Sequence, residues 1–305
     1  MKDFSLSFSN SKAEERFSYW LLVLPALALY VFVMAFPLFF SLFLSVSNYG
    51  GGKVFGNPNF GFAGFKAYAT VFADSFFYTA LRNNIYVVLI SIFGQIPLGF
   101  ILAYILSRGL IRGTDFFQAM IYLPNVISAV IIGILFSRFF LTSNSVWLEI
   151  QRNLFNPAAE FVPGKNPMLP VLAVILWMYT GFYVLIFLAN LQKIDVSIIE
   201  ATKIDGATEA QTLRYIIIPA LSGVIVTSMI LAISGSLRSF DLIFSMTAGG
   251  PARRTSVLAL YMYDRAFRGA PNYPVANAIS TIMMAISFIL IAITRTVQKF
   301  FASEE

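Results

Sequence analysis

The chain has 305 residues, of which 58% are hydrophobic and 12% are charged, so it is too apolar for a soluble globular protein and we expect a membrane protein. It contains neither cysteine nor histidine. Disulfides are therefore excluded, and metal sites, Ser-His triads and imidazole proton relays lose their usual side chains, so we expect no metal site.

The net charge of +6 is compatible with two kinds of partner. Nucleic acid would require a basic helix or an aromatic platform, and we find neither in the sequence. Basic loops beside anionic lipid are the simpler explanation in so apolar a chain. We therefore predict contacts with membrane lipid and no binding of nucleic acid.

The first uncharged run covers residues 19–46 and follows a polar, serine-rich tail. It is too long for the core of a signal peptide, which has roughly 7 to 15 residues, so we interpret it as a retained membrane span. Pro37 within it predicts a bend. The loop that follows, up to Arg82, is rich in glycine, asparagine and aromatic residues, and we expect it to pack on the outer membrane surface.

Five more uncharged runs follow, at residues 84–106, 116–137, 168–191, 216–237 and 275–294. Each has roughly 20 to 24 residues, which at about 1.5 Å per residue is enough to cross the hydrocarbon core of a bilayer. The sequence therefore predicts an all-α, polytopic membrane helix bundle with six transmembrane helices. An even number of spans places both termini on one side, and the density of lysine and arginine in the loops favours the cytoplasm.

A polar, helix-forming stretch at residues 197–219 interrupts the apolar sequence. Ser197 followed by Glu200 predicts a capping box, in which Glu200 turns back to the Ser197 amide and a short helix begins. Gly206 is expected to end this helix, because glycine readily adopts the left-handed conformation of a helix C-terminus.

A second short helix is predicted to begin at Thr208, with Gln211 completing another capping box, and to run to Pro219. We refer to residues 197–219 as the hairpin. Its apolar side chains would be exposed unless a groove on a partner covered them, namely Ile198, Ile199 and Leu213. An ordinary helical hairpin with solvated charges is the alternative.

The interiors of the six runs contain no ionisable residue, and those at the edges are Arg82, Arg138, Arg238, Asp241 and Arg295. Ion-coupled carriers and proton pumps generally need such groups inside the membrane. The sequence also lacks the GxxxxGK[ST] pattern of a P-loop, so we expect no ATP hydrolysis by this chain and predict that it is not an enzyme. Transport against a gradient would need an external energy source, which the hairpin could receive.

The hairpin resembles the EAA loop of importer-type ABC permeases, the membrane subunits of bacterial binding-protein-dependent uptake systems. Five residues fall at the spacing of that loop: Glu200, Ala201, Gly206, Ile216 and Pro219. Thr202 stands where the family usually has a second alanine, and Ile218 where it usually has leucine. The resemblance implies that an ATPase docks on Glu200, Ala201, Thr202, Asp205, Gly206, Ala207, Ile216 and Pro219.

The same resemblance implies the partners of the chain. They are a second homologous permease, two cytoplasmic ATPase subunits and an extracellular solute-binding protein. ATP and Mg would be bound by the ATPase subunits, so no cofactor is expected in this chain. The expected location is the bacterial plasma membrane, which the chain crosses several times with both termini and the coupling hairpin in the cytoplasm.

A second motif follows the fifth run and resembles the FD…T.GGP segment of permeases for carbohydrate uptake. Its matching residues are Phe240, Asp241, Thr247, Gly249, Gly250 and Pro251. The glycines and the proline predict a sharp turn in a segment that dips back at the membrane face, with a plain extracellular loop as the alternative. The resemblance covers residues 80–297, preceded by a tail, first span and loop at 1–79 and followed by a tail at 298–305.

The solute is expected to be neutral, because no charge lies at mid-depth to balance an ion. Sugar recognition combines aromatic faces with amides and hydroxyls, and candidates for the solute path are Asn125, Trp177, Tyr179, Tyr183 and Asn190. Aromatic belts and interhelical contacts could equally account for them.

The sequence thus predicts a permease subunit of an ATP-driven ABC importer for a sugar or oligosaccharide delivered by a solute-binding protein. Two alternatives stay open. One is an importer of the same family for another solute, such as a glycerol phosphate. The other is a passive channel or facilitator, which would need no ATPase.

Overall fold

The computed structural model describes residues 12–53, 60–109, 112–141, 145–154 and 166–302. Within these ranges the regular elements are helices, and one isolated antiparallel bridge joins Ser47 and Phe62. The helices are, in chain order, α1 (Lys12–Tyr30), α2 (Phe36–Ser45), α3 (Lys66–Ala73), α4 (Ser75–Ile90), α5 (Ile96–Ser107), α6 (Thr114–Val126), α7 (Ala129–Phe136), α8 (Val146–Leu154), α9 (Met168–Leu191), α10 (Val196–Ile204), α11 (Glu209–Thr212), α12 (Ile218–Ala220), α13 (Ser222–Leu237), α14 (Asp241–Thr247), α15 (Leu258–Phe267) and α16 (Tyr273–Ala302).

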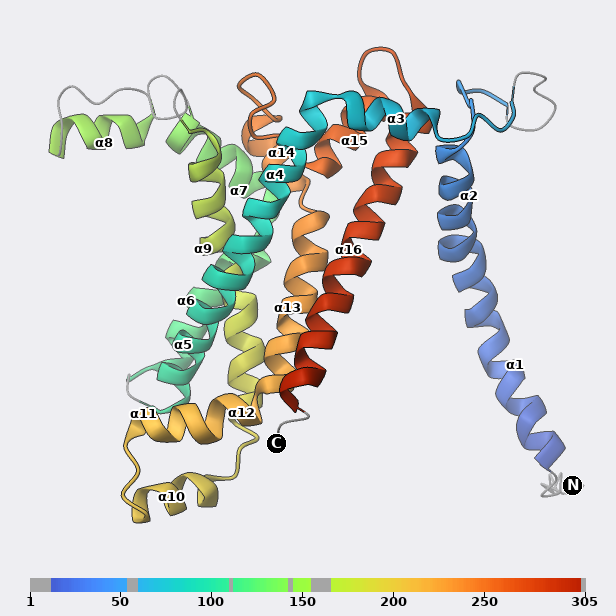
Figure 1. The fold of residues 1–305 in the computed structure, drawn as a ribbon. Helices are drawn as coiled ribbons and strands as arrows, with labels where there is room; N and C mark the ends of the chain where they lie inside the picture. The colour runs from blue at the N-terminus through green and yellow to red at the C-terminus, as the bar shows by residue number, and fades with distance from the viewer. Residues whose placement is uncertain (1–11, 54–59, 110–111, 142–144, 155–165, 303–305) are drawn as a thin grey trace, which may run out of the picture.

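The long helices form a bundle with two different ends (Figure 1). Helices α10 and α11 lie at one end, which we call the hairpin end, together with the start of α1 and the end of α16. Helices α3, α8, α14 and α15 lie at the opposite end, which we call the loop end. The first and last helices therefore open and close at the same end, as an even number of crossings requires.

The lengths and composition of the helices agree with the six predicted spans. Within the described part of the chain, four helices are long and apolar enough to cross a membrane: Glu15–Ser45, Ser75–Ser107, Met168–Leu191 and Tyr273–Thr296. Two bent pairs complete the six if each counts as one span: Thr114–Val126 with Ala129–Phe140, bent by 88°, and Glu209–Ala220 with Ser222–Leu237, bent by 66°.

The third run is therefore not the straight helix that its hydropathy predicts. Helix α6 ends two residues after Pro124, and the chain is extended at Ile127 and Ser128 before α7 begins. Proline removes one backbone donor and crowds the preceding turn, which favours a break here. Packing against α14 also holds α7 in its bent position. Gly133 of α7 lies so close to α14 that a Cβ on it would be 1.9 Å from Ser245 Oγ.

The fifth run also differs from its prediction, since Pro219 does not end the preceding helix. The helix continues through a π-helical segment at Leu213–Ile217 into α12, and the bend comes at Leu221. A proline ring would clash with the carbonyl four residues earlier, and the wider π-helical turn makes room for it. The last helix, α16, likewise continues to Ala302, beyond the predicted span at 275–294.

A π-helical segment also precedes two other prolines. A π-helical segment at Val31–Ala35 leads to Pro37, and another at Ser91–Gln95 leads to Pro97. The helix thus runs unbroken past Pro37, and Glu15–Ser45 counts as one helix.

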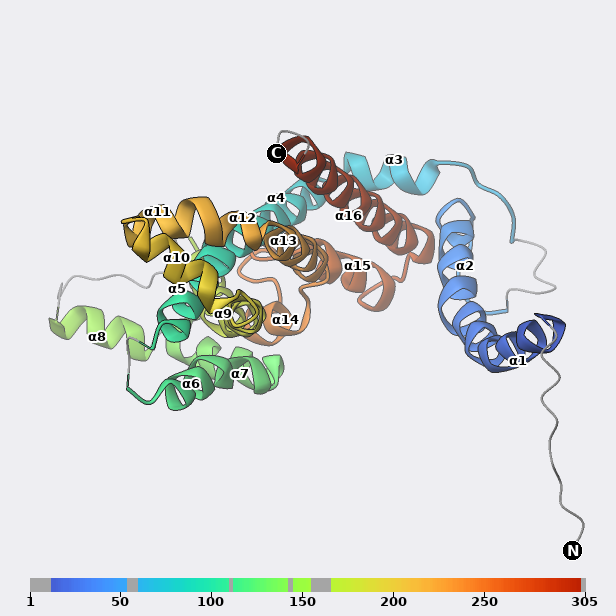
Figure 2. The same cartoon turned by 90° about the horizontal axis from the view of Figure 1, so that it is seen from below.

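The core of the bundle lies around α9. One hydrophobic cluster joins α9 to α7 and α14, and a second joins it to α5 and α13. In the most apolar 18-residue stretch of α9, 56% of the residues are buried in the protein. In the corresponding stretch of Glu15–Ser45, 0% are buried. Seen from the hairpin end, α1 lies apart from the other helices, and the first span contacts the bundle where α2 packs against α16 (Figure 2).

Candidate functional site

A cavity of about 440 Å³ opens between α9, α13 and α14. Tyr179 and Tyr183 of α9 line it, and both lie near the middle of that helix. Its other polar or aromatic lining residues are Ser91, Gln95, Asn125, Phe182, Ser236, Arg238, Ser239, Phe240 and Asp241. The cavity thus lies midway between the two ends of the bundle.

Three of the five residues predicted for the solute path meet here, namely Asn125, Tyr179 and Tyr183. The other two lie elsewhere. Trp177 is two residues from Tyr179, about 200° around the helix, and it packs edge-on against Phe136 with ring centroids 5.4 Å apart.

Asn190 sits near the hairpin end of α9, where its side chain donates a hydrogen bond of 2.8 Å to the Ile186 carbonyl. It does not line the cavity. The prediction treated all polar and aromatic residues of this run alike. In a helix, however, only the residues on one face and at the depth of the cavity can line it.

The sequence reasoning missed several residues of the cavity wall. Gln95 is buried and its side chain donates a hydrogen bond of 2.8 Å to the Ile175 carbonyl of α9. Ser236 donates to Ser91 at 3.1 Å. The available signal was the pair Ser91 and Gln95, two polar residues four apart in an apolar run, which face the same way on a helix.

A neutral solute was expected because no charged side chain was predicted at mid-depth, and Arg238 and Asp241 correct this premise. Both lie at the edge of their run in the sequence, as predicted, yet both line the cavity. The reason is that α13 ends at Leu237, well inside the bundle, and α14 starts from there. The cavity therefore carries one positive and one negative side chain.

The second sequence motif divides into two parts. Phe240 and Asp241 face the cavity, whereas Thr247, Gly249, Gly250 and Pro251 form a turn. Gly249 has φ of 84°, and its amide donates a hydrogen bond of 3.1 Å to the Thr247 hydroxyl.

The helix before this turn, α14, is held in place by its buried side chains Leu242, Ile243 and Met246. They belong to the cluster that includes α7 and α9. A packed helix that returns from the bundle to the loop end differs from a plain loop, and it has the form expected of a segment that dips back at the membrane face.

The hairpin begins two residues earlier than predicted. Asp195 caps α10, and its carboxylate accepts a hydrogen bond of 2.9 Å from the Ser197 amide. The capping box of Ser197 with Glu200 is therefore wrong, because aspartate is an equally strong cap and occupies the N-cap position first. The hydrogen bonds from the backbone and side chain of Ser197 lower the pKa of Asp195.

The turn and the second capping box are confirmed. Gly206 has φ of 75°, a conformation that glycine adopts without strain. Thr208 and Gln211 form the reciprocal capping box, in which the Thr208 amide donates a hydrogen bond of 2.7 Å to Gln211 Oε1. The Thr212 hydroxyl then donates to the Thr202 hydroxyl at 3.2 Å and joins the two helices.

The predicted docking residues of the hairpin fall on two hollows and the surface between them. Glu200 lines one of about 430 Å³, and the other, of about 340 Å³, is lined by Thr202, Asp205, Gly206, Ala207 and Ile216. Ala201 is exposed and Pro219 half-buried.

Apolar side chains are exposed along α10. Ile204 and Val196 are 86% and 65% exposed, and Ile198 is exposed as predicted. Leu213, by contrast, is half-buried and packs against the core cluster of α5, α9 and α13.

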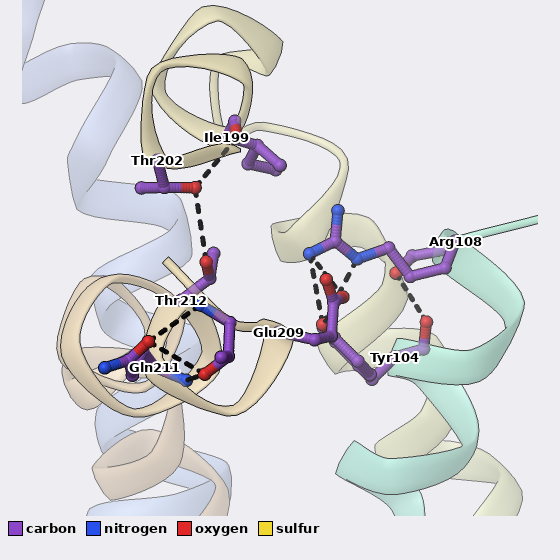
Figure 3. Close-up of polar contacts among 9 residues, drawn as sticks. Tyr104, Arg108, Ile199, Thr202, Glu209, Gln211 and Thr212 are labelled. Atoms are coloured by element: carbon purple, nitrogen blue, oxygen red, sulfur yellow. Dashed lines mark hydrogen bonds and ion pairs between the residues drawn. The ribbon is translucent and has the colours of Figure 1, made fainter. Parts of the chain in front are cut away.

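The hairpin also touches α5. Arg108, just after α5, forms an ion pair of 2.8 Å with Glu209, and Tyr104 donates a hydrogen bond to the same carboxylate (Figure 3). The guanidinium of Arg108 lies 3.1 Å from the Tyr104 hydroxyl. These three side chains, Tyr104, Arg108 and Glu209, are called the α5 clasp below.

Comparison with known proteins decides the family. The family model described as "Binding-protein-dependent transport system inner membrane component" matches residues 95–303. The chain belongs to this family. It is accordingly an ABC transporter permease, a transport subunit of a binding-protein-dependent system.

Relatives of this permease include proteins named for sugar transport. It is 32% identical over 282 residues to the multiple sugar-binding transport system permease protein MsmF of Streptococcus mutans, covering 92% of this chain and 93% of the relative. It is also 32% identical over 276 residues to the lactose transport system permease protein LacF of Rhizobium radiobacter, covering 89% and 90%.

The permease also shares its fold with a chain of a solved transporter. A bacterial ABC transporter involved in the import of the acidic polysaccharide alginate matches with a TM-score of 0.77 and 19% identity, covering 94% of this chain and 96% of that one. The match covers nearly the whole length of both chains, so the permease has the fold of an importer transmembrane subunit.

Proposed function

We propose that this permease forms the translocation path for a sugar or oligosaccharide in an ATP-driven importer. The observation that carries the proposal is the cavity at mid-length of the bundle, where aromatic rings and hydrogen-bonding side chains converge. Relatives named for lactose and for multiple sugars support the solute class.

The cavity lining suits a sugar. Tyr179, Phe182 and Tyr183 offer ring faces for the C–H surfaces of a pyranose. Asn125 and Asp241 offer an amide and a carboxylate for its hydroxyl groups. Binding sites for small molecules usually combine such an apolar wall with a few polar groups.

A second candidate solute is an anion such as a glycerol phosphate, and Arg238 is the observation that favours it. A guanidinium holds phosphate or carboxylate with paired hydrogen bonds. Competition for uptake by neutral sugars and by glycerol phosphate, in vesicles that contain the complete transporter and its binding protein, separates the two. Loss of glycerol phosphate uptake in Arg238→Ala, with no uptake of neutral sugar in the parent, would favour the anion.

The proposal includes the partners of the chain. The hairpin docks on a cytoplasmic ATPase subunit that binds ATP and Mg, with Glu200 and Gly206 central to coupling. A second homologous permease completes the membrane core with a second ATPase subunit, and a solute-binding protein delivers sugar at the loop end, outside the cell. Closure of the ATPases draws the hairpins together and rocks the bundle between inward- and outward-facing states.

The apolar exposure of α10 supports this docking. Val196, Ile198 and Ile204 would be poorly placed on a hairpin surrounded by water. The start of α1 and the end of α16 lie at the hairpin end as well, so with this docking we expect both of them on the cytoplasmic side.

The test is mass spectrometry of the proteins that co-purify with the tagged permease from its native membranes. We expect an ATPase and a second permease, both retained by Gly223→Ala, at a helical position with open space around it, and the ATPase lost in Gly206→Pro. Proline requires φ near −65°, whereas Gly206 has φ of 75°, so the substitution destroys the turn. Recovery of the permease alone, in a detergent that preserves other complexes, would support a passive channel or facilitator instead.

A further inference from the structure

The α5 clasp joins two elements that are far apart in the sequence. Glu209 is the first residue of α11 and so belongs to the hairpin, whereas Tyr104 and Arg108 belong to the end of α5, about a hundred residues earlier. The Arg108 guanidinium lies 2.8 Å from the Glu209 carboxylate and 3.1 and 3.2 Å from the Tyr104 hydroxyl. Both partners thus hold the same carboxylate from one side (Figure 3).

The clasp supplies a connection that the chain itself does not. Helix α10 follows α9 through a short loop, and α11 runs on through α12 to α13, so any movement of the hairpin pulls directly on α9 and α13. Helix α5 has no such covalent link to the hairpin. It can follow the hairpin only through side-chain contacts, which are the apolar packing of α5 in the core cluster with α9 and Leu213 and, at the end of α5, the polar contacts of the clasp.

The other end of α5 reaches the cavity. Gln95, which precedes α5, donates a hydrogen bond of 2.8 Å to the Ile175 carbonyl of α9 and lines the cavity. Gly99 lets the two helices approach so closely that a Cβ on it would lie 2.7 Å from Tyr183 Cβ, and Tyr183 lines the cavity too. A helix of this length spans about 18 Å, enough to link the clasp to the cavity wall.

The solvent exposure of the clasp suits a contact that can break and form again during transport. The side chain of Arg108 is 17% exposed and that of Glu209 is 59% exposed. Solvent therefore weakens the ion pair less than on an open surface, yet neither charge is trapped in the interior, where breaking the pair would be costly.

We propose that Arg108 and Tyr104 are positioning residues for transport, which make α5 follow the hairpin and so transmit ATPase closure to the Gln95 and Tyr183 wall of the cavity. This rests on the proposed function of the hairpin as the ATPase dock. Without the clasp, the ATPase still docks and hydrolyses ATP, but less of each cycle moves the cavity wall.

The test measures sugar taken up per ATP hydrolysed by the complete transporter in proteoliposomes with its binding protein. Arg108→Glu and Glu209→Arg each break the ion pair, and the double variant restores it with the charges exchanged. We expect each single variant to lower the ratio about fivefold or more, the lower end of typical coupling between linked sites. The double variant should recover most of this loss, as the interaction measured in a double-mutant cycle.

Arg112→Glu is the matched control, because Arg112 is exposed in the same loop, four residues after Arg108. It makes the same charge change and should leave the ratio as in the parent. Tyr104→Phe removes one hydroxyl and should give a smaller loss than either charge reversal, which keeps the test informative if a reversal prevents assembly.

The outcomes separate the clasp from the function on which it rests. A parent transporter that takes up sugar with ATP, while Tyr104→Phe and both reversals keep the parent ratio, overturns the clasp alone. Equal losses in the single and double variants, or a loss in Arg112→Glu, also overturn it. A parent complex without an ATPase, or with no ATP-dependent uptake, overturns the proposed function instead.

Discussion

The hairpin and the segment around α14 both carry motifs of the same family, but they are stabilised in opposite ways. No residue of α10 is buried, and nothing lies within 4 Å of the place that a Cβ on Gly206 would occupy. In α14, by contrast, Leu242, Ile243 and Met246 are buried, and Gly133 of α7 packs directly against it.

The comparison teaches where each motif should show its effect. The part of the hairpin from α10 to the start of α11 takes its shape from local caps and a glycine turn, so substitutions there should alter docking and local order more than global stability. The α14 segment takes its shape from tertiary packing, so its substitutions should destabilise the whole bundle.

The largest expected effect is that of Gly133→Ala. The new Cβ would lie 1.9 Å from Ser245 Oγ and 3.0 Å from the Leu242 carbonyl, and rotation of the serine cannot relieve the contact with the backbone. Overpacking of this kind costs about 1–3 kcal/mol, and the midpoint of thermal unfolding in detergent should fall. Gly223→Ala, at a position with open space around it, is the control. An unchanged midpoint for Gly133→Ala would show that α7 and α14 are not packed as described.

Thr247→Val should have the next largest effect. The buried Gly249 amide would lose its acceptor, which now lies at 3.1 Å, and Thr255 would lose a partner at 2.8 Å. An unsatisfied buried donor costs about 1 kcal/mol or more. Thr227→Val removes a hydroxyl exposed on α13 and serves as the control. Equal unfolding midpoints for the two variants would remove the distinction between the two regions.

Thr208→Ala probes the hairpin in the same way. It abolishes the capping box, which is worth about 1 kcal/mol to the start of α11, or about fivefold in local opening. Hydrogen exchange of the amides at 209–212 should accelerate about fivefold, while the global unfolding midpoint stays that of the parent. A clear drop in the global midpoint would mean that the hairpin belongs to the cooperative core.

The smallest effect is a pH dependence at Asp195. Its pKa is lowered in the folded state by the hydrogen bonds of Ser197, so the cap stabilises α10 above the ordinary aspartate value of about 3.9. This contribution is lost as the pH falls through the lowered pKa. Exchange of the first amides of α10 should therefore gain acid sensitivity that Asp195→Asn lacks, because asparagine caps without titrating. Identical profiles for the two proteins would contradict this assignment of the cap.

Local features of the fold could be predicted from the sequence, and features set by packing could not. Gly206 and the Thr208–Gln211 box act within a few residues, so their patterns were sufficient. The break at Ile127 and Ser128 depends on α14 packing beside α7, and hydropathy carries no such information.

The residues of the cavity also divide into those that the sequence could predict and those whose position depends on packing. Asn125, Tyr179 and Tyr183 were found because their residue types suit a sugar, whereas Arg238 was dismissed as a residue at the edge of a span. Distance along a run measures depth only when the helix is straight, and α13 is preceded by a bend of 66°.

The π-helical segment before Pro219 has a consequence for the register of the hairpin. A π-helical turn holds one residue more than an α-helical turn, so Leu213–Ile217 acts as a one-residue insertion in an otherwise α-helical stretch. If these five residues were wound as α-helix instead, α11 would rotate by about 100° relative to α13. Glu209 would then turn away from Arg108. The wider winding of this short segment, as much as the identity of the residues around it, thus sets which face of the hairpin meets α5.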